Sequence, residues 1–91
     1  MRTLEWKDAT SYSRGRERKP NTWTTEIAGL VITVCNGHVN YPGKWIMHCY
    51  DIRLDTIPLD KATTLDEAKQ MAVGLVKRRV ALWDEAMQEV V

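Results

Sequence analysis

The sequence predicts an α+β fold, in which an antiparallel sheet of three to four strands carries one long C-terminal helix on one face. Three observations predict it. Residues 22–52 are rich in the β-branched and aromatic side chains that are typical of strands. Glycine-containing turn signals interrupt this region. From position 64 onward, apolar residues follow the i, i+3, i+4, i+7 spacing of an amphipathic helix instead.

The length of 91 residues predicts a single small domain. Hydrophobic residues make up 44% of the chain, which is too much for intrinsic disorder. A chain of this size has one thin core, and we expect most of the tryptophans to build it: Trp6, Trp23, Trp45 and Trp83. No signal peptide and no apolar run of about 18 residues is visible, so a cytoplasmic location without membrane contact is the expectation.

Two candidate strands precede the middle of the chain. Leu4–Tyr12 is the first, and Thr22–Cys35 is a longer second one that is rich in β-branched residues. The apolar alternation of the second segment changes phase at Gly29. A β-bulge at this position would keep both apolar sets on the core side of one strand. A tight turn at Ala28-Gly29 is the alternative.

The next predicted strands follow a hairpin connection. Asn36-Gly37 suits a type I′ turn, and Pro42-Gly43 suits a type II turn. Lys44–Ile52 is apolar on both faces, so we expect this strand to be central in the sheet. Arg53–Leu59 is expected at the edge, because Pro58 cannot donate a hydrogen bond to a neighbouring strand.

The most clearly marked element is a helix that begins at Thr64 and runs for about 25 residues, to near Gln88. Thr64 and Glu67 have the spacing of a capping box. In this motif the Thr64 hydroxyl accepts the backbone N–H of Glu67, and the Glu67 side chain reaches back to the start of the helix. The face expected to pack on the sheet includes two alanines that permit close approach. Its residues are Leu65, Ala68, Ala72, Leu75, Val76, Trp83 and Ala86.

Positive charge is concentrated between the first two predicted strands. The net charge is only +1, but residues 1–24 contain six Lys or Arg and three Asp or Glu. The segment SYSRGRERKPNTW holds a basic cluster flanked by Tyr12 and Trp23, and its members are Arg14, Arg16, Arg18 and Lys19. Cations bind phosphates and aromatic rings stack on bases, so this segment is a candidate nucleic-acid-binding site. A solvated connection between strands is the alternative.

A second basic run lies in the helix. Lys77, Arg78 and Arg79 are consecutive, so their side chains point in directions about 100° apart and do not form one patch. We therefore expect Lys77 and Arg78 to face water and the stem of Arg79 to cover the flank of the helix, rather than a binding site.

Four residues near the hairpin have the chemistry of metal ligands: Cys35, His38, His48 and Cys49. Neighbouring residues on a strand point to opposite faces, so at most three of the four converge, and no metal or cofactor is expected. Both cysteines are expected as free thiols, and a Cys35–Cys49 disulfide, if the hairpin aligns the two residues, is the alternative. Three acidic residues are expected at turns and the sheet edge: Asp51, Asp55 and Asp60. Without a nucleophile elbow or a phosphate-binding glycine loop, the chain is expected not to be an enzyme.

The helix start, TLDEAK at Thr64–Lys69, resembles a recurrent type of small phage or prophage open reading frame, in which a tryptophan-bearing sheet precedes such a helix. The resemblance spans residues 22–88 and implies an accessory protein that binds a host factor or nucleic acid. It assigns no functional residues. The layout is also similar to antitoxins of the HicB type, which have a three-stranded sheet and a helix in a partial ribonuclease-H-like fold. The present chain has LDKATT where those antitoxins usually have a Gly-Asp turn.

The predicted helix covers only one face of the predicted sheet. The far face is expected to be apolar, and such a face indicates a partner or a second copy. Its candidate interface residues are Ile46, Tyr50 and Ile52. We therefore expect a non-enzymatic binding protein that acts through protein–protein contacts, with a protein partner or as a homodimer. A nucleic-acid-binding accessory protein that uses residues 14–19 is the alternative.

Overall fold

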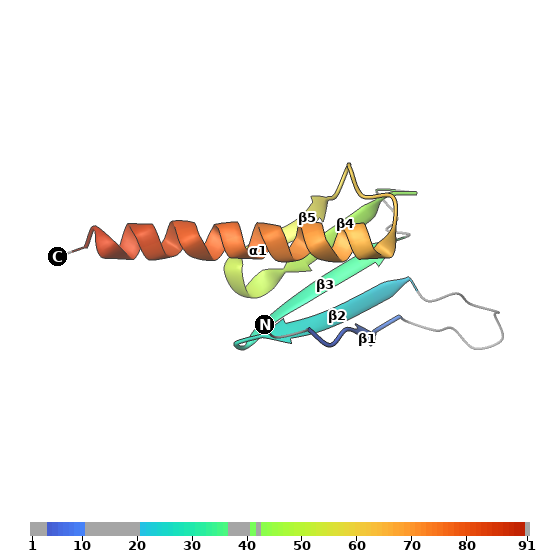
Figure 1. Cartoon of the computed structure of the whole chain (residues 1–91), viewed down its shortest axis with the longest axis horizontal. Helices are drawn as coiled ribbons and strands as arrows, with labels where there is room; N and C mark the ends of the chain where they lie inside the picture. Colours follow the sequence, from blue (N-terminus) through green and yellow to red (C-terminus); the bar gives the residue numbers. More distant parts are fainter. Residues whose placement is uncertain (1–3, 11–20, 37–40, 42, 91) are drawn as a thin grey trace.

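The computed structural model describes residues 4–10, 21–36, 41 and 43–90, and these form an α+β domain. Five strands make one antiparallel sheet in the order β1-β2-β3-β4-β5, so each strand pairs with its neighbour in sequence. A single long helix, α1, lies across one face of this sheet (Figure 1). The strands are β1 (Lys7–Asp8), β2 (Thr22–Ile27), β3 (Leu30–Asn36), β4 (Trp45–Cys49) and β5 (Leu54–Pro58), and α1 is Leu65–Gln88.

The sheet has five strands where three to four were predicted, partly because residues 22–35 form two strands instead of one. Ala28 and Gly29 connect β2 and β3 with φ angles of 49° and 86°. Ile27 pairs with Leu30 directly across this connection. Positive φ at both central residues is what a two-residue type I′ turn requires, and its twist matches that of a hairpin. The predicted bulge at Gly29 is therefore wrong, and the alternative of a tight turn is confirmed.

The N-terminal segment, residues 4–10, runs antiparallel beside β2, but it forms strand pairs only at Lys7 and Asp8. The Thr25 hydroxyl donates a hydrogen bond to the Glu5 carbonyl at 2.7 Å, which holds the segment beside the sheet. After β1 in the sequence, the Thr10 hydroxyl accepts the backbone N–H of Thr22 at 3.1 Å. Over the described residues 4–10, these side-chain hydrogen bonds and a backbone bond from the Ala9 N–H to the Thr22 carbonyl at 2.9 Å supplement the two strand pairs, while the end of the predicted strand Leu4–Tyr12 lies outside the described residues.

The core lies between α1 and the inner strands. It is built mainly from aliphatic residues of β3 and β4 and from three small or β-branched helix residues: Ile32, Val34, Met47, Cys49, Ala68, Ala72 and Val76. The expectation that most tryptophans build the core is wrong. Trp6 and Trp45 are partly buried and pack against the core from outside it, Trp23 is also partly buried, and Trp83 is exposed. Ala68 and Ala72 bring the helix close to the sheet, and this thin layer leaves the large rings at its margins.

The predicted strand Lys44–Ile52 ends earlier than expected. Its strand part is β4, and Tyr50–Ile52 form a short 3-10 helix, η1. Arg53 follows η1 with a left-handed φ of 61° and turns the chain into β5. The expected central position of this strand is confirmed, since β4 pairs with β3 on one side and β5 on the other.

The helix begins as predicted. The Thr64 hydroxyl accepts the Glu67 N–H at 3.2 Å, and the Glu67 carboxylate accepts from the Thr63 and Thr64 hydroxyls at 2.7 and 3.2 Å. These bonds lower the pKa of the Glu67 carboxyl, the Thr63 hydroxyl having the largest effect. The first turn of α1 is thus capped by its own neighbouring side chains.

Candidate functional site

The residues predicted to form binding sites do not form one surface. The predicted nucleic-acid-binding residues lie outside the described residues: Arg14, Arg16, Arg18 and Lys19. Of the predicted protein interface, Tyr50 is 65% exposed, whereas Ile46 and Ile52 are buried. Ile52 does not share a face with Ile46, because η1 interrupts the strand alternation and places Ile52 in the core under α1. That part of the prediction is corrected, and Tyr50 is the surface residue of the three.

A β-bulge in β5 organises the polar groups near Tyr50. Met47 pairs with Ile57 and Cys49 pairs with Leu54, so the single residue His48 stands opposite both Asp55 and Thr56. Thr56 has a φ of 51°, which is rare for a β-branched residue. The bulge therefore frees the Thr56 N–H from the regular strand ladder and requires another acceptor for it.

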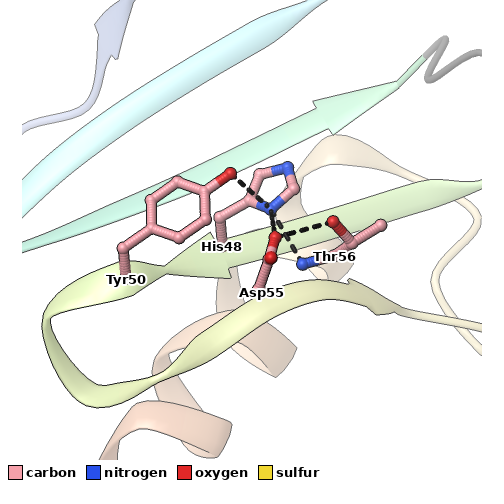
Figure 2. A network of polar contacts seen from close by, with 4 residues as sticks. All are labelled: His48, Tyr50, Asp55 and Thr56. Carbon is pink, nitrogen blue, oxygen red and sulfur yellow. Dashed lines mark hydrogen bonds and ion pairs between the residues drawn. The ribbon is translucent and has the colours of Figure 1, made fainter.

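His48 supplies that acceptor. Its Nδ1 accepts the Thr56 N–H at 2.9 Å (Figure 2). An imidazole nitrogen that accepts from a backbone N–H carries no proton, so His48 has the neutral form protonated at Nε2. The Asp55 carboxylate lies 3.5 Å from the same Nδ1 but donates nothing to it, and it accepts the Thr56 hydroxyl at 2.8 Å. The geometry thus assigns the Nδ1 lone pair of His48 to the backbone of the bulge.

Tyr50 completes this network from the surface. Its ring stacks on the His48 imidazole at 5.3 Å between centroids and 15° between planes. The phenol oxygen lies 3.4 Å from Nδ1. Partial desolvation and then the nearby Asp55 carboxylate raise the pKa of the Tyr50 phenol, so the group is neutral at physiological pH. The cluster provides a rigid aromatic surface, and its polar atoms bond one another.

The two cysteines do not form a reactive pair. Cys49 points into the helix-side core, whereas Cys35 pairs with Ile46 on the opposite face. Burial raises the pKa of both thiols, and for Cys49 the nearby Asp51 charge adds to the effect. Both are therefore protonated thiols, which are weak nucleophiles. Within the described ranges, no three His, Cys, Asp or Glu side chains are arranged to hold a metal ion.

Most of the exposed large apolar side chains lie at the C-terminal end of α1. We call this part of the chain the distal segment (residues 77–90). Figure 1 shows α1 extending past the sheet at the end where η1 and the β2–β3 turn lie. The last buried helix residue is Val76. Five large apolar side chains of the distal segment are exposed: Val80, Leu82, Trp83, Met87 and Val90.

The sequence interpretation placed Trp83 and Ala86 on the sheet, and the structure leaves both exposed. A comparison of lengths accounts for this. A 24-residue helix is about 36 Å long, whereas the seven-residue β3 spans about 23 Å. Part of α1 therefore has no strand beneath it. The sequence did not indicate this difference in length, because one unbroken strand over Thr22–Cys35 would be as long as the helix.

Charge is also ordered along the distal segment. It starts with three basic residues, Lys77, Arg78 and Arg79, and ends with three acidic ones, Asp84, Glu85 and Glu89. No basic residue of this segment has an acidic residue three or four positions away, so the helix offers these charges no ion pair of its own. The segment therefore combines exposed apolar side chains with two unpaired blocks of opposite charge.

Comparisons with protein-family models, with curated proteins and with solved structures give no match for this chain. Among the described helices, none has the length and apolarity needed to cross a membrane.

Proposed function

We propose that this protein is a non-enzymatic binding protein that acts through protein–protein contacts, and that the distal segment of α1 is its principal contact surface. One observation carries this proposal. Of the seven large apolar side chains that are exposed in the described part of the chain, five lie between residues 80 and 90. Monomeric proteins rarely expose such side chains as a contiguous patch unless the patch binds something.

The composition of the patch supports a protein as the ligand. Trp83 and Met87 are 43% and 69% exposed. Tryptophan and methionine are enriched in the cores of protein interfaces, because they bury a large area and adapt to the opposing surface. Charged residues border the patch at both ends, as the rim of an interface requires.

The non-enzymatic part of the proposal rests on the chemistry of the described side chains. The Nδ1 lone pair of His48 is used by the Thr56 N–H, and the raised pKa of both thiols favours their unreactive form. A nucleophile needs an adjacent base that a third group orients. The His48 cluster instead stabilises a bulge.

A capture experiment tests the proposal. The full chain is tagged, incubated with cell extract, and compared with a Trp83→Ser/Met87→Lys double variant by quantitative mass spectrometry. A Val31→Ser variant is the matched control, since Val31 is similarly exposed (46%) but lies on β3. We expect the double variant to lose specific partners that the control retains. Identical recovery by all three proteins, together with unchanged self-association of the purified double variant, would remove the distal segment from the proposal.

The alternative function, binding of nucleic acid through residues 14–19, is supported by the local charge of residues 1–24. It predicts affinity for labelled DNA or RNA that falls steeply between about 50 and 200 mM salt, because each bound phosphate releases counterions. Replacing Arg14, Arg16 and Arg18 by Ala would abolish this binding. Equal, salt-independent anisotropy of the wild type and the triple variant would exclude this alternative.

A further inference from the structure

Three of the exposed apolar residues of the distal segment, Val80, Trp83 and Met87, form a regular seam that starts from the buried Val76. Val76, Val80, Trp83 and Met87 are separated by four, three and four residues. Leu82 lies off this line, and Val90 follows the end of α1. This 4-3 spacing places them along one side of a helix, as in the seam of a coiled coil. The seam continues the buried stripe of Ala68, Ala72 and Val76, so one face of α1 is covered by the sheet in its first half and uncovered in its second half.

The position of the sheet restricts how a second helix can lie on this seam. A parallel helix would extend toward the start of α1, where β3 and β4 already pack against the same face. An antiparallel helix would extend in the opposite direction, beyond residue 90. The uncovered half of the seam thus accepts an antiparallel helix and excludes a long parallel one.

The charges of the distal segment match those of a second copy in this orientation. If Val80 lies opposite the second copy's Trp83, the antiparallel rule also brings Met87 to the level of the second copy's Val76, the last helix residue that its own sheet buries. In the same register, Lys77 lies beside the second copy's Asp84, on the flank of the seam, and the symmetry repeats this contact. Sliding the helices by one heptad would instead place the two Asp84 side chains side by side.

The charge distribution within a single α1 also favours an antiparallel second copy. The C-terminal end of a helix carries a partial negative charge and favours basic residues. In α1 the last turn has no basic residue, and Glu85 and Glu89 lie there as like charges four positions apart. An antiparallel second copy would bring its block of three basic residues, 77–79, toward this acidic end.

We propose that two copies of this chain associate through their distal segments, as an antiparallel helix pair with Val80 opposite Trp83 and Lys77 beside Asp84. This inference rests on the proposed function of the distal segment and names its partner as a second copy. The overlap covers residues 76–87, about 18 Å of helix. Such a short seam places the interface below the standard size of about 1,600 Å², so we expect a dissociation constant in the micromolar range, about 1–100 µM.

Sedimentation equilibrium of the purified full chain tests the association. Between about 2 and 400 µM, the average mass should rise from 10.5 kDa toward twice that value. Trp83→Ala should weaken the dimer at least about 30-fold, because a tryptophan anchor is lost from the seam of both copies. The fold should persist, because residue 83 lies beyond the last buried helix residue. A chain that stays monomeric up to the highest concentration refutes the inference, and the capture experiment would still decide the broader proposal.

Charge exchange tests the orientation and register. Lys77→Glu and Asp84→Lys should each weaken the dimer at least about fivefold, since two attractive contacts become repulsive. Mixing these two variants should restore association, because each copy then offers the charges that the other lacks. Arg78→Glu and Glu85→Lys are the matched controls and should weaken the dimer less than these two variants, because both positions point away from the seam and act only at longer range. A dimer that is insensitive to Lys77→Glu and Asp84→Lys, or that is weakened by Arg79→Glu instead, would overturn the antiparallel arrangement.

Discussion

Replacing His48 by Leu tests whether the imidazole stabilises the β5 bulge. Leu has a similar volume and keeps the apolar contacts, but it has no acceptor for the Thr56 N–H, which now bonds Nδ1 at 2.9 Å. The change removes this hydrogen bond, together with the weaker contacts of the imidazole with Tyr50 and Asp55, at a bulge where the φ of 51° of Thr56 already disfavours the local conformation.

The expected loss of stability depends on whether the Thr56 N–H finds another acceptor in the variant. A typical hydrogen bond contributes a net 0.5–1.5 kcal/mol, roughly, but a donor left without an acceptor costs about 1–3 kcal/mol. The bond is partly buried, so water replaces the lost acceptor only in part. We expect His48→Leu to lower the free energy of unfolding by about 1–3 kcal/mol.

Urea unfolding, followed by tryptophan fluorescence, measures this loss as a shift of the midpoint at constant slope. His48→Asn is the informative second variant, because the Asn amide oxygen reaches nearly the same position as Nδ1 and should recover part of the loss. Tyr50→Phe is the control, since it keeps the stacked ring and removes only the contacts of the exposed phenol with Nδ1 and Asp55, and it should change stability by less than about 0.5 kcal/mol. If His48→Leu unfolds with the same midpoint as the wild type, the bulge does not depend on His48.

Two further substitutions test the turn and the helix cap. Ala28→Asn should raise the free energy of unfolding by about 0.5–1 kcal/mol in the same assay, because Asn adopts the left-handed conformation that Ala28 holds at φ 49° more readily. Glu67→Gln should destabilise the fold only where the carboxylate is ionised. The pKa of Glu67 is lowered in the folded state, so its contribution is present above the ordinary value of 4.5 and is lost as the pH falls through the folded value. Unfolding of both proteins between pH 7 and pH 3, chosen to span roughly that range, should show their difference shrinking toward acid; a constant difference would contradict the role of the charge.

Local signals in the sequence predicted the helix well. The capping residues Thr64 and Glu67 lie three positions apart and bond as expected, and the apolar spacing predicted an end near Gln88. These features depend only on residues within a few turns of one another. The α+β class followed from them and from the β-branched region, and the structure agrees with both.

The hairpin at Ala28-Gly29 was harder to predict, because Ala rarely adopts positive φ and the flanking residues are apolar. The phase change at Gly29 was visible, but a bulge and a turn both explain it. The burial of Ile52 was not predicted, because no residue near it indicates the short helix η1. Arg53, which ends η1 in a left-handed conformation, is not a typical turn residue. The burial of Ile52 depends on where β5 returns to the sheet, which is a tertiary property.

The candidate surface needed one quantity that periodicity does not contain, namely the extent of the sheet under the helix. The spacing that places Val76 in the core also places Trp83 and Met87 on the same face of α1. Which part of this face is buried depends on the lengths and register of the strands. The same apolar spacing therefore marks side chains that pack on the sheet before residue 77 and side chains that are exposed after it.

The bulge in β5 also affects what the sheet edge can do. An open edge strand exposes unpaired backbone groups that template the addition of a strand from another molecule. In β5, the left-handed Thr56 twists the backbone and Pro58 lacks an N–H, while the described pairing of β1, at the opposite edge, covers only Lys7 and Asp8. Both edges thus resist the intermolecular β-pairing that leads to aggregation, so exposed apolar residues can be kept on the helix without the sheet becoming a site of fibril growth.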